Sequence, residues 1–123
     1  MRVIVTGSRK WVNEEAVFDS LTKAYLDQGP FVLVHGACAT GADLFAHRWQ
    51  AAAGGRLGCV EVAYHAEWDK HGRAAGPIRN KAMVAAGADL VLAFPLPTGS
   101  GTQHTIQLAR EAGIETKVWG EDV

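Results

Sequence analysis

The chain has 123 residues, of which 48 % are apolar and 20 % charged, a composition that predicts one globular domain, residues 1–123, with a hydrophobic core of its own. The formal net charge of −1 excludes binding to nucleic acid or to an anionic membrane surface by overall charge alone, so a basic site would have to be local. No apolar run is long enough for a signal peptide or a membrane span, and the two cysteines have neither C-x-x-C nor zinc spacing. We therefore expect a cytoplasmic protein with free thiols and without a metal or other cofactor.

Five short runs rich in β-branched and aromatic residues alternate along the chain with segments of helical periodicity. This alternation is the pattern of βαβ units, which place their strands parallel in one sheet. The central runs are almost entirely apolar, as strands are when helices cover both faces of a sheet. We therefore predict an α/β protein, a three-layer α/β/α Rossmann-like fold with a five-stranded, mostly parallel sheet. The predicted strands are Val3–Thr6, Phe31–His35, Cys59–Ala63, Leu90–Phe94 and Glu115–Trp119.

Glycine and proline bound the helical segments between these runs. Gly29-Pro30, Gly54-Gly55 and Gly87 are expected to end the first three helices. Pro77 is expected in the first turn of the third helix. The apolar faces predicted by the helical period are Val17, Leu21, Ala24 and Tyr25, then Phe45, Trp49 and Ala52, then Ile78, Ala82 and Ala85, and then Ile106, Ala109 and Gly113.

The segment 64–76, YHAEWDKHGRAAG, has no clear period and is expected to be an irregular loop. A long loop within a compact domain is usually functional or disordered, and the aromatic and charged residues of this one favour function. Tyr64 and Trp68 either stack on a base or cap the core, and the sequence does not choose between these two roles.

Each of the first four predicted strands is followed by a segment able to contact a ligand: Thr6–Trp11, His35–Asp43, 64–80 and 95–102. In a doubly wound sheet, ligands bind beyond the carboxyl ends of the strands, near the point where the strand order reverses. Glycine lets a ligand approach the backbone, and free N–H groups at a helix start favour an anion. The sequence has neither a G-x-G-x-x-G motif nor the ending of a P-loop. We expect ligand contacts from Gly7, Ser8, Gly36, Gly41, Gly99, Ser100, Gly101 and Thr102.

Basic residues gather in the same segments, although the chain as a whole is slightly acidic. They suit a phosphate or a carboxylate, to which arginine offers a forked contact. Arg79 follows Pro77 at a predicted helix start, where a cation opposes the helix dipole, so a specific partner is expected for it. Six basic residues lie in these segments. We assign Lys10, Lys70 and Lys81 to the solvated surface, and Arg9, Arg73 and Arg79 to the ligand site.

Two further polar residues lie close to the second predicted strand. His35 ends this buried strand, which favours a hydrogen-bonded structural histidine over a ligand. Asp43 is either an acid at a helix start or a ligand to a ribose hydroxyl or a bound water, and we include it in the ligand site. The remaining candidates for metal ligands, His65, His71 and His104, have no metal-ligand spacing.

Four segments, TGSR, HGACATGAD, EWDKHGRAAGPIRN and LAFPLPTGSGT, occur in an order that resembles a known superfamily and together cover most of the chain. The sequence resembles the YspA-type, cpYpsA-related branch of the SLOG superfamily, a branch common in bacteria and their phages. The superfamily unites Rossmann-like proteins, among them the Lonely Guy phosphoribohydrolases, the DNA-uptake protein DprA and proposed sensors of nucleotide-derived signals. The resemblance implies a Rossmann-like domain with a site for a nucleotide or a nucleotide-derived molecule.

The resemblance to the Lonely Guy enzymes extends to single residues. Arg79 looks like the counterpart of their functional arginine at a short helix start, and Asn80 stands where a lysine follows it. Their phosphate-binding PGGxGTxxE motif is similar to residues 97–105, in which the matching positions are Gly99, Gly101 and Thr102.

Two positions depart from that motif: Thr98 replaces a glycine, and Thr105 replaces the catalytic glutamate. Cleavage of an N-glycosidic bond builds positive charge on the sugar, which a carboxylate stabilises or relieves by activating water, and a threonine does neither. Substitutes for the missing acid are Glu67 and Asp69, which would act with Arg79 after the loop moves, or Asp43.

Three functions follow from this reasoning. The favoured one is a module that binds a nucleotide or nucleotide-derived small molecule, as a sensor or in processing, with Trp68 covering the base. The second is a nucleotide hydrolase that cleaves an N-glycosidic or phosphate bond. The third is a DNA- or protein-interaction module, which the net charge disfavours for DNA. We also expect a homo-oligomer, most simply a dimer, because Trp49 and Trp119 exceed the apolar surface that a small monomer needs to expose.

Overall fold

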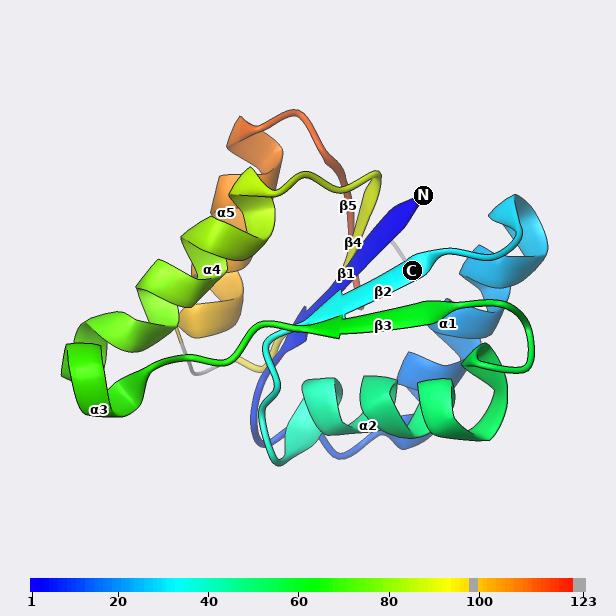
Figure 1. The fold of residues 1–123 in the computed structure, drawn as a ribbon, viewed down its shortest axis with the longest axis horizontal. Coiled ribbons are helices and arrows are strands. Elements are labelled where there is room, and N and C mark those ends of the chain that lie inside the picture. The colour runs from blue at the N-terminus through cyan, green and yellow to red at the C-terminus, as the bar shows by residue number, and fades with distance from the viewer. Residues whose placement is uncertain (98–99, 121–123) are drawn as a thin grey trace.

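The computed structural model describes residues 1–97 and 100–120, and the strands in this part of the chain form one sheet. The strand order is β3-β2-β1-β4-β5, and every neighbouring pair is parallel (Figure 1). This confirms the predicted α/β Rossmann-like fold and makes the described sheet parallel throughout. The strands are β1 (Arg2–Gly7), β2 (Val32–His35), β3 (Val60–Ala63), β4 (Leu90–Phe94) and β5 (Glu115–Val118).

Helices pack on both faces of the sheet and give the molecule three layers. They are α1 (Glu14–Gln28), α2 (Gly41–Trp49) with the π-helical turn η1 (Gln50–Gly54), α3 (Trp68–His71) with the 3-10 turn η2 (Gly72–Ala74), α4 (Ala75–Ala85) and α5 (Gly101–Glu111). α1 and α2 cover one face of the sheet, while α4 and α5 cover the other (Figure 1). Within residues 1–97 and 100–120, no helix combines the length and the apolar character needed to cross a membrane.

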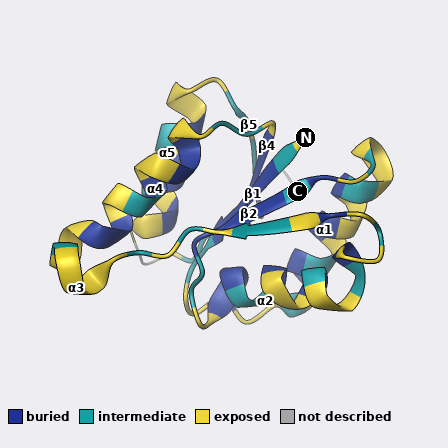
Figure 2. Cartoon of the chain, viewed as in Figure 1, coloured by how far each residue is buried: buried dark blue, intermediate teal, exposed yellow. Residues whose placement is uncertain are grey.

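Alternate residues of the central strands face the two helical layers. In β1, Val3 and Val5 belong to the core cluster under α1 and α2, while Ile4 belongs to the cluster under α4 and α5. All three side chains are fully buried, and so is every residue of β4 (Figure 2). Because apolar side chains fill both faces of these strands, polar chemistry is confined to the ends of the sheet.

Helix α1 illustrates how local sequence sets the ends of a helix. At its start, the side-chain oxygen of Asn13 accepts a hydrogen bond from the Ala16 N–H at 3.1 Å. At its end, Gly29 has a φ of +81° and its N–H donates to the Tyr25 carbonyl, as the glycine signal predicts. Gly87, with a φ of +90°, follows α4 in the same way.

The third predicted helix begins earlier than expected, and the segment 64–76 is not the irregular loop we predicted. It contains α3 and η2, and α4 starts at Ala75, so Pro77 is the third residue of this helix and lies in its first turn, as predicted. The four residues of α3 span barely one helical turn, which is too short for an apolar period to reveal.

The apolar face predicted for the third helix is wrong. Ile78, Ala82 and Ala85 are exposed, whereas Asn80 and Met83 are buried against the sheet and α5. The helical period alone favoured the larger apolar set, but α4 turns the polar Asn80 inward because this side chain makes hydrogen bonds at the end of the sheet. The faces predicted for α1 and α5 are largely correct, with Leu21 and Ile106 both buried.

Trp49 does not support the predicted self-association, because its side chain is only 1 % exposed. The indole ring stacks on Phe31 with 5.7 Å between ring centroids, and its Nε1–H donates to Thr22 Oγ1 at 3.1 Å. Trp119 is half-buried against the same core cluster. The homo-oligomer therefore stays a prediction, and exposure of Trp49 no longer supports it.

Candidate functional site

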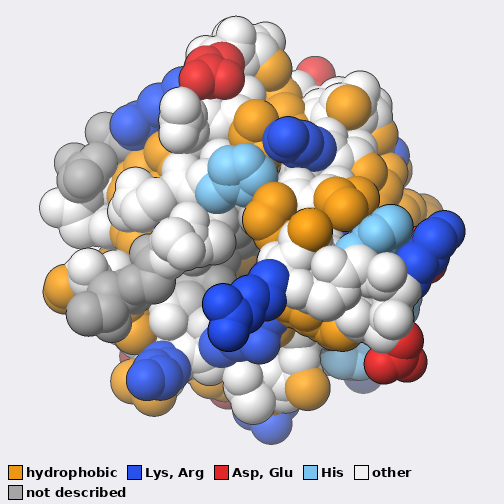
Figure 3. Space-filling model, turned by 90° about the vertical axis from the view of Figure 1, so that its left-hand side faces the viewer, with side chains coloured by type: hydrophobic (Ala, Val, Ile, Leu, Met, Phe, Trp, Pro, Cys, Tyr) orange, Lys and Arg blue, Asp and Glu red, His pale blue; other side chains and the backbone are white. Residues whose placement is uncertain are grey.

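A cavity of about 720 Å³ lies at the carboxyl end of the sheet, where β1 and β4 separate. The chain runs from β1 outward to β2 and β3, and then crosses β1 to continue at β4, so the strand order reverses at this point. This is where open α/β sheets bind their ligands, and the volume suits a small molecule. Figure 3 views the molecule from this side, where more Lys and Arg than Asp and Glu side chains are visible.

Most residues that the sequence assigned to the ligand site line this cavity. Gly41, Glu67 and Asp69 do not line it, and Gly99 lies outside the described residues. The two loop acids are exposed near the start of α3, so neither of them stands in the described cavity for the missing catalytic glutamate. The predicted residues that do line it are Gly7, Ser8, Arg9, Gly36, Asp43, Trp68, Arg73, Arg79, Asn80, Ser100, Gly101 and Thr102.

Sequence reasoning missed several other lining residues. Lys10, which we assigned to the surface, borders the cavity together with Cys38 of the turn after β2. His104 and Met83 were missed because the inward faces of α4 and α5 depend on the exact starts of these helices, which the sequence did not give. His104 could have been predicted, because it follows Gly101 by three residues and the two therefore lie on the same side of a helix.

The cavity is strongly cationic relative to the chain. Among the described residues that line it, Asp43 is the carboxylate, whereas the Lys and Arg side chains are Arg9, Lys10, Arg73 and Arg79. In a chain with a formal net charge of −1, this excess is local. It raises the local concentration of anions and favours a ligand with phosphate or carboxylate groups.

Arg79 and Asn80 connect the two walls of the cavity. Arg79 Nη1 donates to the Gly36 carbonyl at 2.5 Å, and Arg79 Nε donates to Asn80 Oδ1 at 2.8 Å. Asn80 Nδ2 in turn reaches the Gly101 carbonyl at 3.4 Å, at the start of α5. Arg79 lies in the second turn of α4, and the helix dipole acts mainly on charges in the first turn, so it does not oppose this cation as predicted. The partner of Arg79 is the Gly36 carbonyl. The guanidinium still has further N–H donors for a ligand.

The turn Gly36–Cys38 is held by side chains from three elements. Asp43 accepts hydrogen bonds from the N–H groups of Cys38, at 3.2 Å, and Gly36. His35 Nδ1 accepts the N–H of Ala37 at 3.0 Å. A methyl group at Gly36 would displace the Arg79 guanidinium and crowd Asp43 Oδ2, so glycine lets both side chains approach the turn this closely. These N–H groups are bound within the protein, unlike those of a phosphate-binding loop.

Burial dominates the electrostatics of Asp43. The residue is 8 % exposed, and this loss of hydration raises the pKa of its carboxyl above the ordinary aspartate range. His35, the two N–H donors and the positive charge of Arg79 oppose this shift without reversing it. Asp43 therefore combines a structural contact to the turn with a position in the wall of the cavity.

Gly41 supports the cavity without lining it. Its φ is +74°, and a methyl group there would strike the carbonyl of Ser8. The same Ser8 carbonyl accepts the N–H of Trp11 at 3.1 Å, while Ser8 N–H donates to the Phe94 carbonyl at 3.1 Å. Gly41 thus allows the start of α2 to pack against the turn after β1.

The structure distinguishes the two roles left open for Trp68 and Tyr64. Trp68 is 47 % exposed at the border of the cavity, where the guanidinium carbon of Arg9 lies 5.1 Å from its ring centroid. Tyr64 instead packs, half-buried, against the core cluster that contains Val34 and Met83. Trp68 is therefore the aromatic side chain available to a ligand, and Tyr64 belongs to the core.

The start of α5 forms the opposite wall. Ser100 precedes the helix without capping it by a side-chain hydrogen bond, and a Cβ at Gly101 would meet no atom within 4 Å from the described residues beyond its own helix and chain neighbours. Thr102 is buried and lines the cavity. Thr105, at the position of the catalytic glutamate in the Lonely Guy motif, is fully buried, and its hydroxyl donates to the Gly101 carbonyl at 3.4 Å.

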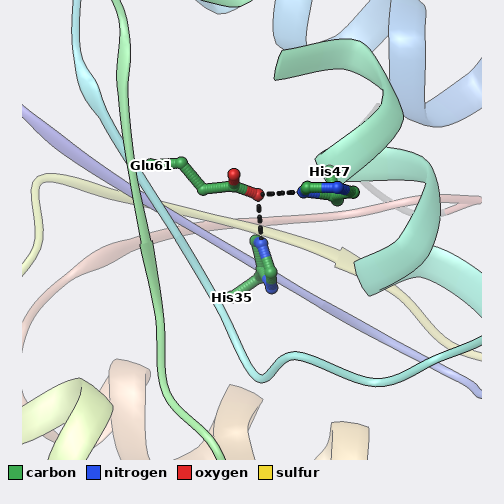
Figure 4. A group of neighbouring side chains, drawn as sticks. All are labelled: His35, His47 and Glu61. Atoms are coloured by element: carbon green, nitrogen blue, oxygen red, sulfur yellow. Dashed lines mark hydrogen bonds and ion pairs between the residues drawn. The ribbon is translucent and has the colours of Figure 1, made fainter. Parts of the chain in front are cut away.

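A second polar cluster lies behind the turn after β2 and consists of His35, His47 and Glu61 (Figure 4). Glu61 Oε2 is 2.7 Å from His35 Nε2 and 2.8 Å from His47 Nδ1. Partial burial by itself raises the pKa of the Glu61 carboxyl, but the hydrogen bonds from both rings outweigh it, so this pKa lies below the ordinary range. The hydrogen bonds confirm the structural role expected for His35, whereas no pattern in the sequence pointed to His47.

The comparisons with known proteins identify the family of this chain. A model of the YspA, cpYpsA-related SLOG family matches residues 1–71. The chain belongs to this family. It is also 43 % identical over 125 residues to the Gene 61 protein of Mycobacterium phage D29, with 98 % of this chain and 97 % of the phage protein covered. The resemblance seen in the sequence is thereby confirmed, and the matched range contains the turns after β1 and β2 that form one wall of the cavity.

Proposed function

We propose that the protein binds a nucleotide or a nucleotide-derived small molecule in the cavity between β1 and β4, as a sensor or as part of a processing system. The observation that carries this proposal is the ring of four basic side chains and one carboxyl around a cavity at the strand-order reversal. Membership of the SLOG family is consistent with such a ligand. The proposal places the phosphate of the ligand at Ser100–Thr102, where the N–H groups of a helix start and its dipole favour an anion.

The other parts of the ligand have matching neighbours. Arg73 and Lys10 are exposed at the border of the cavity and would pair with phosphate oxygens. Trp68, with Arg9 over its ring, offers an aromatic surface for a base. Asp43 is the lining carboxyl able to accept a hydrogen bond from a sugar hydroxyl.

Binding is better supported than hydrolysis. Thr105 is buried and bonded within α5, and Glu67 and Asp69 do not line the cavity. Asp43 does line it, but its carboxylate already accepts the N–H groups of the turn after β2. No described carboxyl is therefore both in the cavity and free to serve as the acid or base of glycosidic cleavage.

The test compares phosphorylated and unphosphorylated ligands by calorimetry after a thermal-shift screen with nucleotides, nucleosides and ADP-ribose-like compounds. A ligand at about 100 times its dissociation constant stabilises the fold by about 2.7 kcal/mol, which is readily measured. Arg73→Ala should weaken a nucleotide about tenfold and the matching nucleoside by less than twofold, because only the former loses a charge contact. The control is Arg56→Ala, an exposed arginine that does not line the cavity. No stabilisation by any compound, or equal weakening of nucleotide and nucleoside, would contradict the proposal.

A further inference from the structure

The turn after β2 adopts a conformation that needs support. Ala37 has a φ of +58°, the one positive φ of a non-glycine residue in the described part of the chain. This left-handed region is disfavoured for a residue with a Cβ. The contact that holds Ala37 there is the hydrogen bond from its N–H to His35 Nδ1.

That hydrogen bond fixes the protonation of His35. Because Nδ1 accepts the Ala37 N–H, it must carry a lone pair, so the proton of the neutral ring is on Nε2. Nε2 then donates to Glu61 at 2.7 Å, and His47 Nδ1–H donates to the same carboxylate oxygen at 2.8 Å. Glu61 therefore selects the tautomer of His35 that Ala37 requires (Figure 4).

The turn transmits this choice to the cavity. The residues on either side of the Ala37 N–H are Gly36, whose carbonyl binds Arg79, and Cys38, whose N–H binds Asp43. Both Arg79 and Asp43 line the cavity, whereas His35 and Glu61 do not. His35 is thus placed to act on the ligand site through the backbone and not by contact with the ligand.

A metal ion is the competing explanation for the cluster, because His35, His47 and Glu61 offer three ligand atoms within 4.8 Å of one another. A metal would need the lone pair of His35 Nε2, which moves the ring proton to Nδ1. The Ala37 N–H and the Nδ1–H would then face each other as two donors at 3.0 Å. The hydrogen bonds therefore favour a proton-bearing network over a metal site.

We propose that neutral His35, held as its Nε2–H tautomer by Glu61, is a positioning residue that fixes the turn Gly36–Cys38 and with it Arg79 and Asp43 in the ligand site. Without an acceptor at Nδ1 the Ala37 N–H loses its partner and the turn is released, so ligand affinity falls. The titratable groups around His35 are Glu61 of β3 and His47 and Asp43 of α2, and Arg79 of α4 contacts the adjacent Gly36. The inference about affinity rests on the proposed function, whereas the inference about the tautomer does not.

The tautomer is tested first, without any ligand. A long-range ¹H–¹⁵N correlation spectrum of the full chain should show His35 with an unprotonated Nδ1 and a protonated Nε2. One equivalent of zinc chloride should leave the His35 and His47 signals in place. The opposite tautomer, or a stoichiometric zinc-induced shift of both rings, would overturn the proposal even if every nucleotide fails to bind.

Two substitutions then separate the two sides of the ring. His35→Asn keeps an acceptor near the position of Nδ1, whereas His35→Gln keeps a donor near Nε2 and loses the acceptor for Ala37. The affinity for a bound nucleotide should fall less than threefold in His35→Asn and about tenfold in His35→Gln.

The variant Ala37→Gly serves as a rescue, because glycine adopts a positive φ without help. Added to His35→Gln, it should restore folding if that variant is unstable, and should recover part of the affinity. Equal affinities of the Asn and Gln variants, or a double variant no better than His35→Gln, would contradict a positioning role.

Discussion

The turn after β2 and the start of α5 face the same cavity but are built in opposite ways. In the turn, the N–H groups of Gly36, Ala37 and Cys38 are bound by side chains of the protein. At the start of α5, Ser100 provides no side-chain cap, and the space beside Gly101 is open. A glycine-rich turn is therefore not by itself an anion site: the N–H groups of one wall are bound within the protein, and the other wall begins a helix without a side-chain cap.

The largest expected effect tests the turn after β2. Gly36→Ala should lower the free energy of unfolding by about 1.5 kcal/mol, because the new methyl group displaces the Arg79 guanidinium and breaks its hydrogen bond to the Gly36 carbonyl. Urea denaturation followed by circular dichroism measures this change. A loss below about 0.5 kcal/mol would show that Arg79 moves aside easily and that the wall is not rigid.

The matched substitution on the other wall, Gly101→Ala, should change the free energy of unfolding by less than about 1 kcal/mol, since its methyl group meets no neighbour among residues 1–97 and 100–120 outside its own helix. It should weaken a phosphorylated ligand about tenfold, because the methyl group stands at the helix start where the phosphate is expected. The same calorimetric titration measures this loss. If Gly36→Ala and Gly101→Ala behaved alike in both measurements, the contrast between the walls would be wrong.

Asp43→Asn sharpens the comparison through pH. Burial raises the pKa of the Asp43 carboxyl, so the folded protein holds this proton more tightly than the unfolded chain does. Asp43 therefore makes the free energy of unfolding fall as the pH rises from the ordinary aspartate range through the raised pKa. Denaturation across pH should show this decline in wild type and a flatter profile in the asparagine variant, which keeps an oxygen for the Cys38 N–H. Parallel profiles would mean that Asp43 is not desolvated.

The smallest expected effect comes from Glu61→Gln. Glu61 supports the turn after β2 through its hydrogen bond to His35. The pKa of Glu61 is lowered in the folded state, so its contribution is present above the ordinary glutamate range and is lost as the pH falls through the lowered value. Near neutral pH we expect the substitution to lower the free energy of unfolding by about 1 kcal/mol, and this loss should disappear in acid. The expected loss is smaller than for a fully buried carboxylate because the Glu61 side chain is 22 % exposed. The control is Glu115→Gln, an exposed residue of β5 that should have no measurable effect. A loss that persists unchanged in acid would contradict the ionic origin.

Sequence reasoning succeeded where one local signal determines the structure. The strands followed from apolar runs such as Leu90–Phe94, whose bounds the structure reproduces, and Gly29 ended α1 through its positive φ. It failed for the inward face of α4, since Asn80 is buried by hydrogen bonds to residues distant in sequence, which no helical period encodes.

The candidate site shows the same division. The basic residues and glycine turns could be placed at one end of the sheet, because parallel strands all end there. Which N–H groups are already bound could not be predicted, since the answer depends on three side chains from separate elements meeting at one turn. His47 and Glu61 were missed for this reason, because each is an ordinary surface residue until the fold brings it to His35.

The central position of β1 also has a consequence for synthesis on the ribosome. β1 is the first strand to be made, yet one of its two neighbours, β4, follows only at Leu90–Phe94, and Val3 pairs with Leu90 across that interval. Contacts between such distant segments form late and slowly in folding. The Ser8 N–H donates to the Phe94 carbonyl at the end of the sheet where the cavity lies, so a growing chain completes this end only when most of it has left the ribosome.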